Sequence, residues 1–361
     1  MENFKNDYTE FDGEVYTAFF YGDMELTFEY TTKFFASEGI NPYSDKIALK
    51  IGGRLTKIGD SAFSGFFGVI SAELSESITE IGRKAFSGCV SLTEFNIPAS
   101  VTAIGEEAFA ITSILNFNVS PQNQSYKSID GNLYTKDGTV LVQYAGGKED
   151  ESFVVPHGVT TILKYAFSAS FLLEVELPSS VTTICNGAFE ASSELKHITL
   201  PEGLVTIGER AFSDCCDLEE IEIPSTVTAI GDSAFDSCFD LADLTLSEGL
   251  ISIGNYAFYS CDALCGVEIP KTVQTIGRSA FESCSQVSEI ELHEGLTTIG
   301  KKAFSGCSEV TEITIPKSVT EIGEDAIDGD DDLVIYCKAA SKPAGWHDFW
   351  SGIHKNIEWQ S

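Results

Sequence analysis

Acidic side chains recur at two places in a short segment that is repeated along this chain, and carboxylates in rows can bind a basic surface or a hard cation. One copy reads Leu-Glu-Glu-Ile-Glu-Ile-Pro over residues 218–224. In an extended strand Ile221 and Ile223 would face one side and Glu220 and Glu222 the other. The same alternation in the other copies predicts a ligand-binding face, expected to be concave, made of Glu94, Glu174, Glu176, His197, Glu220, Glu222, Asp243, Glu268, Glu289, Glu291 and Glu312.

Three interpretations of these acidic rows are open. They are a solvated negative face that limits aggregation, a surface that binds a basic protein partner, or a row of oxygen ligands for Ca²⁺. Like charges opposed on neighbouring strands repel each other. The cost is only about 1 kcal/mol for a pair about 4 Å apart in water, which a stable core can tolerate. The chain has no loop pattern that would wrap a cation, so we predict no metal site.

The ten cysteines could form disulfides or bind a metal, and six of them share one place in the repeat. Equivalent positions in stacked repeats would point every thiol inward, where cysteine behaves as a small hydrophobic residue. Side chains stacked in line rarely meet the geometry that a disulfide needs. We therefore predict a structural role for Cys89, Cys215, Cys238, Cys261, Cys284 and Cys307.

Catalytic motifs are missing from the sequence. It contains no G-x-S-x-G, H-E-x-x-H, Walker, EF-hand or G-x-G-x-x-G pattern. The histidines lie in different repeats or in the C-terminal tail, at His157, His197, His293, His347 and His354, so none forms an obvious pair of ligands. We therefore expect no enzyme activity and no cofactor.

The elements that position these side chains follow from a 23-residue repeat. An Ile-Gly pair marks each copy, and a Phe follows the Ile by five residues in all but the last. The Ile positions are Ile58, Ile81, Ile104, Ile162, Ile184, Ile207, Ile230, Ile253, Ile276, Ile299 and Ile322, with Gly replaced after Ile162 and Ile184. Each unit predicts a strand, a second extended stretch and a short helical turn. A unit this small can bury its apolar residues only by stacking on its neighbours, which predicts a solenoid.

The repeat resembles the BspA-type leucine-rich repeat, written roughly L-x-x-I-x-I-P-x-x-V-x-x-I-G-x-x-A-F-x-x-C. The resemblance covers residues 46–338. It implies a leucine-rich-repeat solenoid of about 11 to 13 coils. It also implies a binding protein or scaffold, because members of this family are often cell-surface proteins and some resemble adhesins for matrix proteins.

Three segments depart from the repeat. Residues 120–152 contain two Asp-Gly pairs between apolar runs, which predicts a β-hairpin insertion. The insertion is either a decoration of the fold or a flap that contacts a ligand. Residues 1–45 are expected to form an N-terminal cap, which could be a degenerate repeat. Residues 339–361 are expected to form a C-terminal cap, and they hold all three tryptophans, Trp346, Trp350 and Trp359.

Carbohydrate binding is an alternative function. A row of threonines occupies one position of the second extended stretch, and it could contact sugars together with the aromatic residues of the tail. The interpretation that needs no ligand is that cross-strand Thr pairs suit a half-exposed sheet. The row comprises Thr56, Thr79, Thr102, Thr160, Thr182, Thr228, Thr297 and Thr320.

Charge and hydropathy limit the partners. The chain carries 22 basic and 55 acidic residues, a net charge of −33. Such a charge repels nucleic acid and favours a basic protein partner. The family resemblance adds a matrix-like protein as a candidate partner. No apolar run is long enough to span a membrane. The N-terminus shows no signal sequence, so we expect either a cytoplasmic protein or, if a signal has been removed, a secreted or surface protein.

Overall fold

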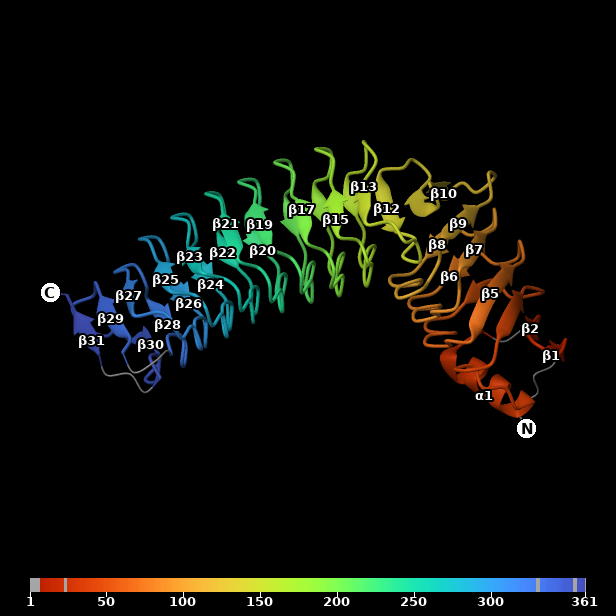
Figure 1. The fold of residues 1–361 in the computed structure, drawn as a ribbon, viewed down its shortest axis with the longest axis horizontal. Coiled ribbons are helices and arrows are strands. Elements are labelled where there is room, and N and C mark those ends of the chain that lie inside the picture. The colour runs from red at the N-terminus through yellow and green to blue at the C-terminus, as the bar shows by residue number, and fades with distance from the viewer. Residues whose placement is uncertain (1–6, 23–24, 329–331, 353–355, 361) are drawn as a thin grey trace. The chain divides into compact units, whose positions relative to one another are not determined.

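The computed structural model describes residues 7–22, 25–328, 332–352 and 356–360. It divides into two compact units, each built from stacked coils (Figure 1). The N-terminal unit contains residues 1–149 and 163–170, and the C-terminal unit contains residues 150–162 and 171–361. The predicted solenoid is confirmed.

Each coil of the C-terminal unit contributes two strands. The first strands carry the outward acidic residues and are β13 (Ser152–Val154), β15 (Glu174–Glu176), β17 (His197–Thr199), β19 (Glu220–Ile223), β21 (Asp243–Leu246), β23 (Gly266–Glu268), β25 (Glu289–Glu291), β27 (Glu312–Ile315), β29 (Val334–Cys337) and β31 (Ile357–Trp359). The second strands have two residues each and are β14 (Thr161–Ile162), β16 (Thr183–Ile184), β18 (Thr206–Ile207), β20 (Ala229–Ile230), β22 (Ser252–Ile253), β24 (Thr275–Ile276), β26 (Thr298–Ile299), β28 (Glu321–Ile322) and β30 (Gly345–Trp346).

The repeat length sets the register of these strands. Ile276 of β24 lies opposite Ile253 of β22 and Ile299 of β26, each one repeat away, and the pairing is parallel. A constant repeat therefore places every sequence position beside its own equivalents in the neighbouring coils. Side chains at one repeat position therefore form a row along the unit.

The turn after each Ile-Gly pair is tight. A Cβ on Gly277 would lie 2.6 Å from the backbone nitrogen of Asn255 in the preceding coil, so only Gly fits. Two residues later Ser279 has a φ of 53°, in the left-handed region, and the equivalent residue in the other ten copies marked by the Ile is also left-handed. These left-handed residues give hydrogen-bonded turns in place of a regular helix. The described residues contain one α-helix, α1 (Phe28–Glu38).

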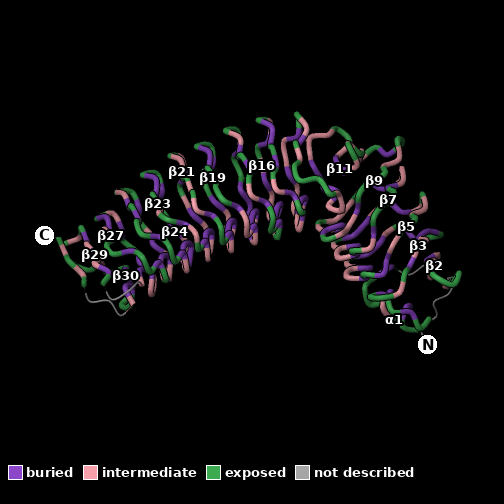
Figure 2. The backbone as a smooth tube through the Cα atoms, in the orientation of Figure 1, coloured by how far each residue is buried: buried purple, intermediate pink, exposed green. Residues whose placement is uncertain are grey.

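The core of the C-terminal unit is a stack of phenylalanine rings. Phe235 lies 5.1 Å from Phe212 and 5.2 Å from Phe258 between ring centroids, with the ring planes within 5° of parallel. Ala234 and Cys238 are fully buried beside the stack. Buried and exposed residues alternate along the coils (Figure 2).

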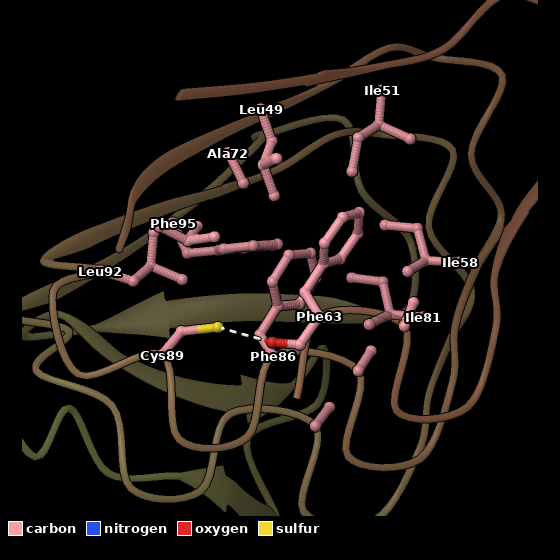
Figure 3. Packing of buried hydrophobic residues seen from close by; sticks show 14 of the residues in the cluster. Leu49, Ile51, Ile58, Phe63, Ala72, Ile81, Phe86, Cys89, Leu92 and Phe95 are labelled. Carbon is pink, nitrogen blue, oxygen red and sulfur yellow. Dashed lines mark hydrogen bonds between the residues drawn. The ribbon is translucent and has the colours of Figure 1, made fainter. Parts of the chain in front are cut away.

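The N-terminal unit continues the same pattern. Its first strands are β3 (Ile47–Ile51), β5 (Val69–Leu74), β7 (Glu94–Ile97) and β9 (Asn116–Val119), and its second strands are β4 (Lys57–Ile58), β6 (Glu80–Ile81) and β8 (Ala103–Ile104). Phe63 and Phe86 stack at 5.3 Å between ring centroids. Figure 3 shows these rings between aliphatic side chains from both rows of strands, with Cys89 beside them.

Two further strands and α1 cover the first coil of this unit. Strand β1 (Tyr8–Phe11) pairs antiparallel with β2 (Tyr16–Phe20), and β2 pairs parallel with β3. Helix α1 begins after Thr27, whose hydroxyl accepts a hydrogen bond from the backbone N–H of Tyr30, and ends at the left-handed Gly39. It buries Phe34 and Phe35 against the core.

The insertion forms an antiparallel hairpin followed by a third strand. Strand β10 (Tyr126–Ile129) pairs with β11 (Asn132–Thr135), and β11 pairs with β12 (Val140–Gln143). Asp137 caps the second turn, because its carboxylate accepts hydrogen bonds from Thr139 and Thr135. These bonds, the Thr139 N–H first, lower the pKa of Asp137 to about 2. The Tyr126 hydroxyl accepts a hydrogen bond from Ile104 N–H at 3.0 Å, which holds the hairpin on the preceding coil.

The tail packs two of its tryptophans. Trp346 and Trp350 are each only 3% exposed and meet edge to face at 4.8 Å between ring centroids. The Trp346 indole N–H donates to the carbonyl of Val319 in the preceding coil. These contacts favour a capping role for the tail aromatics over sugar binding.

Candidate functional site: the acidic strand face

All eleven residues predicted to form the binding face are exposed. Ten of them lie in the C-terminal unit, on the first strands β15 to β27, while Glu94 lies on β7 of the N-terminal unit. We call the ten residues of the C-terminal unit the acidic strand face. They are Glu174, Glu176, His197, Glu220, Glu222, Asp243, Glu268, Glu289, Glu291 and Glu312.

The parallel register sets carboxylates directly opposite one another. Glu220 faces Asp243 across β19 and β21, and Glu268 faces Glu291 across β23 and β25. Glu174 is different, because its partner across β15 and β17 is His197. Opposed like charges repel, so this face stores an unfavourable electrostatic energy that a cation or a basic surface would relieve.

Some charges on the turns form ion pairs, in contrast with those on the acidic strand face. Lys302 Nζ lies 2.8 Å from Glu282 Oε1, and Arg210 Nη2 lies 2.8 Å from Glu190 Oε1. Among the described residues, no lysine or arginine lies within ion-pair distance of any member of the acidic strand face. The carboxylates of the acidic strand face therefore lack the basic partners that some turn carboxylates have.

Two hollows open on this face, and the sequence analysis did not anticipate them. One has a volume of about 430 Å³ and is lined by the carboxylates of Glu220, Glu222 and Asp243, with Pro201 and Pro224 at the strand ends. The other has a volume of about 580 Å³ and lies between β25 and β27. Its lining includes the acidic residues Glu289, Glu291 and Glu312 together with His293 and Lys338. The acidic strand face therefore has two recesses as well as negative charge.

His293 was not predicted to belong to the face, yet it contacts the same surface. Its side chain is half-buried, and its ring approaches the carboxylates of Glu268 and Glu291. The signal in the sequence was its spacing, because His293 follows the outward Glu291 by two residues and side chains two apart share one face of a strand. His197 lies on the face opposite Glu174, His157 and His347 lie elsewhere in the described structure, and His354 lies outside the described residues.

The threonine row has structural partners. The hydroxyl of Thr79 donates to the carbonyl of Thr56, and that of Thr102 donates to the carbonyl of Thr79. In the C-terminal unit Thr320 donates to the carbonyl of Thr297 in the same way. These hydroxyls link successive coils, which favours the structural interpretation of the row.

The six cysteines that share one repeat position are buried, as their spacing predicts. Each thiol donates to the carbonyl of a core Phe in the preceding coil, as Cys238 does to Phe212 at 3.3 Å. Burial raises the pKa of the Cys89 and Cys307 thiols to about 12. A thiol held protonated in this way is a poor nucleophile and a poor metal ligand.

The repeat can now be compared with known families. Residues 44–136, 146–247 and 205–334 match the BspA type leucine rich repeat region, in six copies. The chain belongs to the BspA-type leucine-rich-repeat family. As a member of that family it is a repeat scaffold.

Solved structures of bacterial leucine-rich-repeat proteins share the fold. A leucine rich cell surface protein from Faecalibacterium prausnitzii is 31% identical with a TM-score of 0.54, and the match covers 69% of this chain and 60% of that one. A leucine-rich repeat protein from Eubacterium ventriosum is 22% identical with a TM-score of 0.59, covering 88% and 90%. The pneumococcal vaccine antigen PcpA is 22% identical with a TM-score of 0.55, covering 87% and 68%.

Two negative findings complete the comparison. No curated protein matches the chain. Within the described residues, no helix has both the length and the apolar character needed to cross a bilayer.

Proposed function

We propose that this protein is a non-enzymatic recognition module, adhesin-like or a scaffold, that binds a basic protein partner on the acidic strand face. The observation that carries the proposal is the row of exposed carboxylates without counter-charges, opposed in register on β19 and β21 and on β23 and β25. Some lysines and arginines on the turns form ion pairs with acidic neighbours, whereas the carboxylates of this face have no such partner among the described residues.

The chemistry of the partner follows from the charge. Lys and Arg side chains entering the two hollows would pair with carboxylates that now repel one another, and the field of the face would accelerate their approach. A place at the bacterial surface, with a matrix-like partner, is part of the proposal. It is supported by the likeness to the Faecalibacterium cell surface protein, whose length this chain spans to 60%.

Binding to a panel of immobilised basic and matrix proteins at physiological salt tests the proposal. We expect at least one protein to bind, with an affinity that falls steeply as salt is raised, because exposed charges are screened. The face variant carries Lys in place of Glu220, Glu222, Glu289 and Glu291, and it should lose binding while its unfolding transition is retained.

A matched variant separates the face from the overall charge. It carries Lys at four exposed acidic residues of the turns, Glu194, Asp240, Asp262 and Glu309, so its net charge changes by the same amount. We expect it to keep most of its binding. Equal loss of binding in both variants, or full binding in the face variant, would contradict the proposal that this face binds the partner.

A further inference from the structure

We propose that Glu268, Glu291 and His293 form a binding site for a divalent transition-metal ion such as Zn²⁺ at the edge of the acidic strand face. One atom from each side chain lies within 4.8 Å of the other two. The donor set is two carboxylate oxygens and one imidazole nitrogen, which is a typical ligand set for Zn²⁺ and its neighbours. The proposal does not depend on whether the face binds a protein.

The fold places the three ligands by two simple rules. Glu268 and Glu291 are opposite residues of the parallel strands β23 and β25, so their side chains leave the sheet together. His293 follows Glu291 by two residues and lies on the same side. Metal–ligand bonds of about 2.0–2.2 Å require neighbouring donors roughly 3–4 Å apart. Both carboxylates are exposed, so small side-chain rotations would bring the three atoms to that spacing.

His293 occupies a place in the repeat that other coils use differently. The position just after the first strand is proline in most coils, at Pro98, Pro156, Pro178, Pro201, Pro224, Pro270 and Pro316. The strand end therefore does not need an imidazole. The neighbouring hollow on β25 and β27 is lined by Glu291 and His293, so water and ions can reach the donors.

Electrostatics favours a cation at this point. Glu268 and Glu291 oppose each other without a lysine or arginine at ion-pair distance among the described residues. The pair formed by Glu220 and Asp243 also has opposed carboxylates, one outward position earlier on its strands, but the residue two after Asp243 is Thr245 and not histidine. This second pair is therefore a natural control that carries the charge without the imidazole. Three protein ligands would leave one position of a tetrahedral ion open to water.

The test is Zn²⁺ binding by the full chain, measured by equilibrium dialysis and by the histidine ring NMR spectrum. The exposed thiol of Cys265 could bind Zn²⁺ independently, so all proteins carry Cys265→Ser. We expect one bound Zn²⁺, with the His293 ring signals shifting during the first equivalent. His293→Gln assigns those signals and should weaken binding at least about tenfold, as should Glu268→Gln combined with Glu291→Gln.

The control carries Glu220→Gln and Asp243→Asn and should keep the full affinity. Ca²⁺ at the same concentration should leave the His293 ring signals in place, because it prefers oxygen ligands. The proposal is overturned if His293→Gln binds Zn²⁺ as tightly as its parent, or if the His293 signals do not move. Equal weakening by the control pair would also overturn it, since that result means general attraction to negative charge.

Discussion

A few buried side chains stabilise each coil, and the contribution of each can be tested by a single substitution. Phe235 is fully buried between two parallel rings, whereas Phe239, four residues later, is 43% exposed. Cys238 is buried beside the stack, whereas Cys265 is exposed. The chain thus provides a buried and an exposed example of each residue type, within one coil for phenylalanine and in neighbouring coils for cysteine.

Replacing Phe235 with Ala should lower the free energy of unfolding by about 3–5 kcal/mol, because the change removes apolar contacts and leaves a cavity. Urea denaturation measures the loss. Phe239→Ala is the control and should cost well under half as much. If the two variants were equally stable, the ring stack would not be a main source of stability.

Thiol alkylation should distinguish the cysteines. Cys265 should react within minutes in the native protein, because its thiol is exposed. Cys89 and Cys307 should react only after unfolding, since burial raises their thiol pKa to about 12 and excludes the reagent. Mass spectrometry of the digested protein identifies the labelled sites. Early labelling of Cys89 or Cys307 would contradict their buried placement.

At the scale of elements, the second strand and the tight turn after it hold adjacent coils together. The N–H of Gly277 donates to the carbonyl of Ile253, and the N–H of Phe281 donates to the carbonyl of Ala303 in the coil that follows. The turn therefore bonds to the coils on both sides. Close approach of backbones is the reason that Gly recurs there.

Gly277→Ala should destabilise the protein, because the added Cβ would lie 2.6 Å from the backbone of the preceding coil. We expect a loss of about 1–3 kcal/mol, as for other overpacked sites. Gly266→Ala is the control, since its Cβ would have an ordinary contact at 3.6 Å with the carbonyl oxygen of Glu289. The unfolding midpoint in urea compares the two, and a harmless Gly277→Ala would refute the packing argument.

At the scale of the whole molecule, the net charge of −33 is distributed unevenly. Turn carboxylates such as Glu190 and Glu282 have basic partners. The opposed residues of the acidic strand face do not. The folded state therefore carries a repulsive term that added salt should reduce.

Stability should rise as NaCl is raised from about 10 mM to about 150 mM, because the screening length falls from about 30 Å to about 8 Å. The thermal unfolding midpoint records the rise. A variant with Glu220→Gln and Asp243→Asn should begin with a higher midpoint and respond less to salt. Neutralising the turn residues Asp240 and Asp262 is the comparison, and it should change the salt response less. An identical response in the two variants would show that the opposed pair adds nothing specific.

The sequence alone determined the fold and the direction of the side chains. A fixed repeat forces parallel stacking, and the alternation of Ile221 and Ile223 with Glu220 and Glu222 assigns the buried and exposed sides of each strand. The binding role of the face remains a proposal, since exposure and charge are all that a strand pattern can specify.

Only the tertiary structure decided what lies next to what. The opposition of Glu268 and Glu291 depends on the register of two coils, and the approach of His293 to both depends on how the strand ends. The hollows depend on the space left between strands and the loops that follow them, which side-chain type alone does not specify. The repeat places equivalent side chains in rows. A residue that departs from the repeat, such as His293 at a position that is usually proline, can be assigned a role only from the side chains that lie near it in the folded protein.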